Sequence, residues 1–95
     1  MIYNVKKITP FIDFGFGVTE ITVAAGKPVT VWLSTLYNRN AYTFELSAPG
    51  TVTKISDYEY LVDHDTEGLY PITLTVASKD GTISLVSNTI TLNLN

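Results

Sequence analysis

The most regular stretch of the sequence is Gly68-Leu69-Tyr70-Pro71-Ile72-Thr73-Leu74-Thr75-Val76. From Tyr70 to Val76, every second side chain is large and apolar, and the residues between them are proline or threonine. Because successive side chains of a β-strand point to opposite faces, this period of two indicates a strand with one buried face. Pro71 removes a ladder donor, so we expect full pairing of this strand to begin only at Ile72.

The same alternation recurs on both sides of this stretch. It covers Ile21 and Val23, Val29 to Leu33, Tyr42 to Leu46, Tyr58 to Val62 and Ile90 to Leu94. Residues 51–57 are less regular, with Val52 and Ile55 as the expected inward residues. Short strands separated by turn signals, such as Asp80-Gly81, predict an all-β antiparallel sandwich of roughly seven to nine strands. The expected core is Val29, Val31, Leu33, Tyr42, Phe44, Tyr70, Ile72, Leu74, Val76, Ile90 and Leu92.

Composition limits the classes of function. The 95 residues suit one domain, and 45% of them are hydrophobic while 16% are charged, which is unlike a disordered chain. The net charge is −3 with six basic residues, so the basic stripe of a nucleic-acid binder is missing. Absence of cysteine excludes disulfides and thiolate sites. No apolar run approaches the ~20 residues of a membrane helix, and residues 1–17 do not resemble a signal peptide.

Three stretches resemble immunoglobulin-like domains of bacteria and phages, in particular the PKD type. These are Ala25-Gly26-Lys27-Pro28-Val29-Thr30-Val31, Ala41-Tyr42-Thr43-Phe44-Glu45-Leu46 and the stretch from Gly68 to Val76. The resemblance spans roughly Thr19 to Asn95 and implies an immunoglobulin-like sandwich. It also implies that the Tyr70 hydroxyl forms a tyrosine corner with a backbone acceptor in residues 63–67; the alternative is a plain core tyrosine. The family's Trp-Asp-Phe-Gly-Asp-Gly signature is absent, and the similar Ile12-Asp13-Phe14-Gly15-Phe16-Gly17 is interpreted as coincidence.

No arrangement of residues predicts catalysis. His64 is the only histidine, and no Gly-x-Ser-x-Gly motif accompanies it. Asp63, Asp65 and Glu67 alternate as calcium ligands can, but the EF-hand spacing is missing, and a polar turn is the favoured interpretation over a metal site. We therefore expect a protein that is not an enzyme and that has no cofactor.

Aromatic side chains point instead to binding. Trp32 has the opposite parity to Val31 and Leu33, so it should face outward and contact a partner; stacking on a sugar or an inward position are the alternatives. Residues 1–18 carry three of the four phenylalanines. We expect them to form an apolar arm or an extra strand before the sandwich of residues 19–95. We expect residues 2–17 to dock on a partner, because a free tail would not be so apolar. The predicted partner-binding residues are Phe11, Phe14, Phe16 and Trp32.

Two settings fit these features. In the first, the chain is a phage head-decoration or auxiliary capsid protein, made in the host cytoplasm and bound to capsid or other virion proteins. In the second, it is an extracellular module of a larger bacterial surface or polysaccharide-degrading protein. We expect a protein partner, with capsid or other virion proteins first, and neither nucleic acid nor membrane insertion; self-association is a further alternative.

Overall fold

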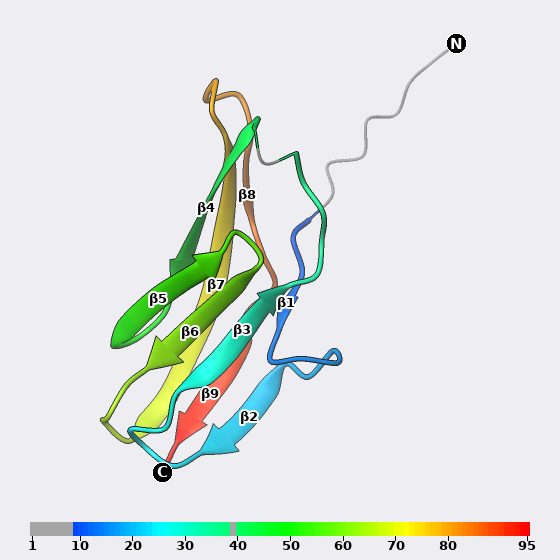
Figure 1. Cartoon of the computed structure of the whole chain (residues 1–95). Helices are drawn as coiled ribbons and strands as arrows, with labels where there is room; N and C mark the ends of the chain where they lie inside the picture. The colour runs from blue at the N-terminus through cyan, green and yellow to red at the C-terminus, as the bar shows by residue number, and fades with distance from the viewer. Residues whose placement is uncertain (1–8, 39) are drawn as a thin grey trace.

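The computed structural model describes residues 9–38 and 40–95, which form nine β-strands (Figure 1). The strands are β1 (Ile12–Asp13), β2 (Glu20–Val23), β3 (Val29–Leu33), β4 (Tyr42–Ser47), β5 (Thr51–Ser56), β6 (Glu59–Asp63), β7 (Gly68–Ser78), β8 (Ser84–Val86) and β9 (Ile90–Leu94). Within these residues there is no helix long and apolar enough to cross a membrane.

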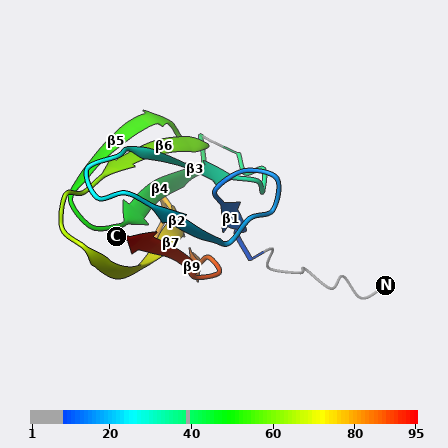
Figure 2. The same ribbon diagram turned by 90° about the horizontal axis from the view of Figure 1, so that it is seen from below.

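Two sheets pack face to face as a sandwich (Figure 2). One has the order β1-β3-β6-β5, and the other has the order β2-β9-β7-β4 with β8 paired to β7. If β2 and β8 are set aside as additions, the remaining strands β1, β3, β4, β5, β6, β7 and β9 can be lettered A to G. Their orders then correspond to the ABED and GFC sheets of the immunoglobulin fold, which confirms the predicted fold class. One detail differs from a purely antiparallel sandwich, because β2 runs parallel to β9.

β1 lies within residues 1–18, which the sequence left open as either an apolar arm or an extra strand. β1 pairs with β3, where Ile12 lies opposite Leu33, and the Ile12 side chain is fully buried. The Asn88 side chain holds the other side of β1, since its Oδ1 accepts the Ile12 amide at 2.8 Å and its Nδ2 donates to the Ile12 carbonyl at 3.0 Å. An extra strand is therefore what the structure shows for Ile12–Asp13, while residues 1–8 lie outside the described residues.

The core lies between the two sheets and contains most of the predicted residues. All the predicted members are buried except Tyr42 and Tyr70, which are half-buried and pack against the core. The buried hydrophobic residues not predicted are Ile12, Tyr60, Val62 and Leu94. Period-two alternation thus identified the inner faces of β3, β7 and β9, where the burial pattern follows the sequence pattern.

One prediction about a single residue is wrong, and one about Pro71 is close to what the structure shows. Ile55 is exposed rather than inward, because it lies three residues after Val52 and therefore on the opposite face from it, and Val52 packs against the core. A bulge between Lys54 and Ser56 shifts the register of β5 against β6 at this point. The expectation that full pairing of β7 begins only after Pro71 agrees with the structure to within one residue, because β7 pairs with β9 from Gly68 onward but has strands on both sides only from Thr73. On its other side β7 meets β4 only from Thr73, so the proline lies where that edge of β7 has no neighbouring strand among the described residues.

The predicted tyrosine corner is present. The Tyr70 hydroxyl donates to the Thr66 carbonyl at 2.9 Å and lies 3.2 Å from the Glu67 carbonyl, both within the predicted range of acceptors. The His64 ring contacts Tyr70 edge-on, with 3.1 Å between His64 Nε2 and the Tyr70 hydroxyl oxygen. Gly50 packs closely against this loop, and a side chain at position 50 would clash with Asp63 and His64. Gly50 also has a positive φ of 69°, which favours glycine.

Asp80 organises the turn between β7 and β8. Its Oδ1 accepts hydrogen bonds from the Thr82 hydroxyl at 2.7 Å, the Thr82 amide at 3.0 Å and the Ser78 hydroxyl at 2.7 Å. These bonds, those from Thr82 first, lower the pKa of Asp80 from 3.8 to about 2. The ionised form therefore stabilises the turn.

We expect Asp80 to stabilise the fold above pH 3.8 and to lose this contribution as the pH falls toward about 2. The sign follows because a carboxyl whose pKa is lower in the folded state releases its proton more readily there. Urea unfolding of the wild type and of Asp80→Asn should show the wild type more stable near neutral pH. A difference between the two that persists unchanged at pH 2 would contradict this assignment.

Candidate functional site

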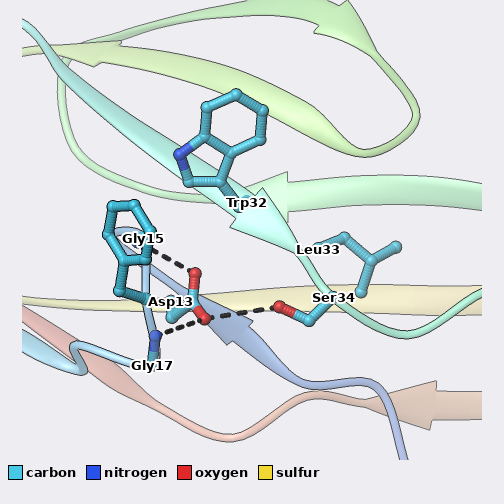
Figure 3. A pocket seen from close by; sticks show the side chains of 7 residues that line it. Asp13, Gly15, Gly17, Trp32, Leu33 and Ser34 are labelled. Atoms are coloured by element: carbon cyan, nitrogen blue, oxygen red, sulfur yellow. Dashed lines mark hydrogen bonds between the residues drawn. The ribbon is translucent and has the colours of Figure 1, made fainter.

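A tight loop follows β1 and is built on the Asp13 carboxylate (Figure 3). Asp13 Oδ1 accepts the Gly15 amide at 2.9 Å, and Oδ2 accepts the Gly17 amide at 3.1 Å and the Ser34 hydroxyl at 3.3 Å. The Phe14 amide donates to the Val18 carbonyl at 2.7 Å and closes the loop. Asp13 itself is buried, with 5% of its surface exposed. The spacing Asp13-x-Gly15-x-Gly17, interpreted from sequence as coincidence, therefore has a structural role.

This loop holds Phe16 outward in an uncommon conformation. Phe16 has a φ of 52°, between Gly15 at 109° and Gly17 at 77°, and its side chain is fully exposed at 109%. A left-handed backbone costs a bulky L-residue roughly 1–2 kcal/mol, and glycine or asparagine avoids most of this cost. Packing does not offset that cost, because the ring is in solvent. Such local strain is typical of residues kept for function rather than for stability.

Trp32 lies beside this loop on the outer face of the β1-β3-β6-β5 sheet. Its indole is 40% exposed, which confirms the outward orientation predicted from its parity. Gly15 lies next to it, since a Cβ built on Gly15 would be in ordinary contact, 3.8 Å, with the indole Nε1. Trp32 pairs with Asp13 on β1 and with Glu59 on β6. Directly opposed residues share a face, so these three side chains form one row across the sheet.

The loop and the sheet border an open hollow of about 550 Å³. Its lining residues are Asp13, Gly15, Phe16, Gly17, Trp32, Leu33 and Ser34. A hollow of this size is in the range of small-ligand sites. It combines an indole and an exposed phenyl ring with a buried carboxylate, so it suits an amphipathic group more than a purely apolar one.

The four predicted partner-binding residues separate into different environments. Phe16 and Trp32 line the hollow. Phe14 is half-buried and packs against the core, so it supports the fold. Phe11 is 39% exposed but is not among the residues that line the hollow, and its backbone is tied to the chain after β3 through Thr35 and Ser34. Residues 2–8 of the predicted docking segment lie outside the described residues.

Sequence reasoning missed Asp13, Ser34 and Glu59 as members of this region. The signal for Asp13 was its spacing from two glycines, because an aspartate can accept amides two and four residues later while glycines adopt positive φ. Ser34 and Glu59 could not be found without the register of β3 against its neighbours.

The loop with the only histidine forms a second, polar hollow. Gly50, Thr51, Asp63, His64 and Asp65 line about 280 Å³. The Tyr70 hydroxyl proton is directed to a backbone carbonyl, so His64 Nε2–H donates to the Tyr70 oxygen. His64 therefore supports the tyrosine corner. No group of three or more metal-ligating side chains gathers within residues 9–38 and 40–95.

Comparison with known proteins gives a likeness in fold. No family model and no curated protein matches this sequence. Among solved structures, an endo-beta-1,4-mannanase from Thermotoga petrophila is similar, with a TM-score of 0.57 and 9% sequence identity. The match covers 96% of this chain and 21% of the mannanase, so the chain spans about a fifth of that enzyme's length. At this identity the likeness concerns the fold alone.

Proposed function

We propose that this chain is a non-enzymatic binding domain that attaches to a protein partner through the loop of residues 14–18. The observation that carries the proposal is Phe16, a fully exposed aromatic residue at a φ of 52° on a loop fixed by three hydrogen bonds to Asp13. Protein interfaces draw most of their binding energy from a few aromatic or arginine anchors. A rigid loop that presents such an anchor loses little conformational freedom on binding.

The absence of catalysis is part of the same proposal. His64 is held by Tyr70, and the one hydroxyl residue among the described residues that line its hollow is Thr51, for which no hydrogen bond to His64 is seen. The contacts of His64 serve the loop between β6 and β7, which the tyrosine corner also stabilises. We therefore assign His64 to the fold.

The partner that we propose is a virion protein, with the chain as a capsid decoration or auxiliary protein. This setting rests on the use of single immunoglobulin-like domains by phages, a fold-level analogy. The second setting is an extracellular module of a polysaccharide-degrading protein, and the fold likeness to part of a mannanase favours it. In that setting too, the exposed Phe16 and Trp32 would be the contact residues.

A photoreactive phenylalanine analogue at position 16 tests the proposal. In particles or cells that produce the protein, we expect a covalent adduct with one defined protein. The same analogue at position 69 is the control, because Leu69 is equally an exposed apolar residue but lies on β7 in the other sheet. A virion protein in the adduct supports the first setting. Equal adducts at both positions, or none at position 16, would refute docking through the loop.

Phe16→Asn separates binding from folding. Asparagine tolerates positive φ better than phenylalanine, so the free energy of unfolding should stay the same or rise by up to about 1 kcal/mol. Binding to the partner identified by the adduct should weaken at least about tenfold, as for a central aromatic anchor. Urea unfolding and a binding titration measure the two effects. A loss of more than about 1 kcal/mol in stability would show that Phe16 belongs to the fold.

A further inference from the structure

The charged side chains in and next to the hollow beside Trp32 are acidic. Asp13 lines the hollow, whereas Glu59 lies outside the lining, on the other side of Trp32 in the row across the outer face of the sheet. Both residues are acidic. Among the described residues 9–38 and 40–95, those that line the hollow include no basic residue. Lys54, on β5 of the same sheet, is engaged elsewhere, since its Nζ lies 2.9 Å from the Asp57 carboxylate.

From this arrangement we propose that the hollow takes a basic side chain, an arginine in the first place, projected by the protein partner. The inference rests on the proposed function and names the chemistry that the partner must present. The guanidinium would stack on the Trp32 indole, and the methylene groups of the arginine side chain would lie against the exposed Phe16 ring. Asp13 in the lining and Glu59 beside Trp32 would supply the countercharge.

Charge and shape both favour a cation over a neutral group. A cation over an indole face is attracted by the ring quadrupole, and tryptophan is the best aromatic residue for this contact. Arginine fits better than lysine, because its planar group stacks on aromatic faces and is less strongly hydrated. The apolar part of the lining suits the stem of such a side chain. The Glu59 carboxylate has no hydrogen bond or ion pair within the described part of the chain, so it can face a cation.

A neutral sugar fits the hollow less well. It would need free acceptors beside the indole, but both Asp13 oxygens already accept bonds from Gly15, Gly17 and Ser34. These bonds use most of the hydrogen-bonding capacity of the carboxylate while its negative charge remains. The Asp13 carboxylate can therefore still attract a cation, but it has few acceptor positions left for the hydroxyl groups of a sugar.

The only tryptophan of the chain is the residue at the site, so its fluorescence reports binding directly. We would titrate the full chain with the blocked tripeptide acetyl-Gly-Arg-Gly-amide and with its citrulline counterpart, which has nearly the same shape without the charge. We expect saturable quenching by the arginine peptide and at least about tenfold weaker binding of the citrulline peptide. Glu59→Gln should weaken arginine binding about three- to tenfold, and raising the salt concentration should weaken it further.

Glu45→Gln is the matched control, because Glu45 is exposed on β4 in the other sheet and should leave the affinity unchanged. Equal binding of the two peptides, or no change in fluorescence up to about 100 mM of the arginine peptide, would overturn the inference. Tighter binding of a soluble glucomannan fragment than of the arginine peptide would overturn it in favour of a sugar site. A protein adduct at position 16 together with equal binding of the two peptides would sustain the proposed function while refuting the arginine site.

Discussion

Leu74→Ala should lower the free energy of unfolding by about 3–5 kcal/mol, the upper part of the range for buried leucines. Leu74 is fully buried on β7, which pairs with β9 along its first half and with β4 along its second. The surrounding strands are fixed by these ladders, so the cavity left by the missing side chain cannot easily collapse. A 95-residue domain has a total stability of roughly 5–10 kcal/mol, so this change alone should bring the domain close to unfolding.

Leu69→Ala is the matched control for this prediction. Leu69 is the same residue type on the same strand, but its side chain is 66% exposed on the outer face. We expect its replacement to change stability by less than about 0.5 kcal/mol. Urea unfolding curves of the two variants and the wild type provide the comparison. Similar losses at both positions would contradict the observed orientation of β7.

The success of the sequence in predicting β7 has a simple physical origin. The strand has an inner and an outer face, and burial selects residues with the same period of two that the backbone imposes. The outward position of Trp32 on β3 followed from the same rule. In strands long enough to show the period of two, such as β3 and β7, the position of a residue in the alternation therefore predicted which face of the sheet its side chain occupies.

Alternation along the sequence could not predict features that depend on contacts between distant segments. β1 has two residues, too few for a periodic pattern, and its burial depends on Leu33 and Asn88, which are distant in sequence. Ile55 was misplaced because it lies three residues from Val52, so that alternation puts the two on opposite faces, and Val52 is the one that packs against the core. The hollow next to Trp32 likewise depends on register, since only the pairing of β3 with β1 and β6 places acidic residues on both sides of the indole.

Residues 9–17 contribute to the fold by packing into the core and by hydrogen bonding to neighbouring segments, and deletion can distinguish these contributions from docking on a partner. Ile12 fills the core, the Phe11 carbonyl accepts the Ser34 amide at 2.9 Å, and the Asn88 side chain bonds both the amide and the carbonyl of Ile12. Removal of this segment exposes the core next to Leu33 and leaves the Asn88 side chain without these partners. Loss of a buried isoleucine and of such hydrogen bonds is destabilising through two separate terms.

We therefore expect deletion of residues 1–17 to lower the free energy of unfolding by about 4 kcal/mol or more. Deletion of residues 1–8 is the control, because it keeps Ile12, Asp13 and every contact described for β1. Urea unfolding of both truncated chains, followed by circular dichroism, measures the difference. If the chain without residues 1–17 were as stable as the chain without residues 1–8, β1 would not be integral to the sandwich. The whole N-terminal segment would then be the docking arm that its aromatic composition suggested, and Phe16 would have to be assigned to that arm instead of to a loop braced by Asp13.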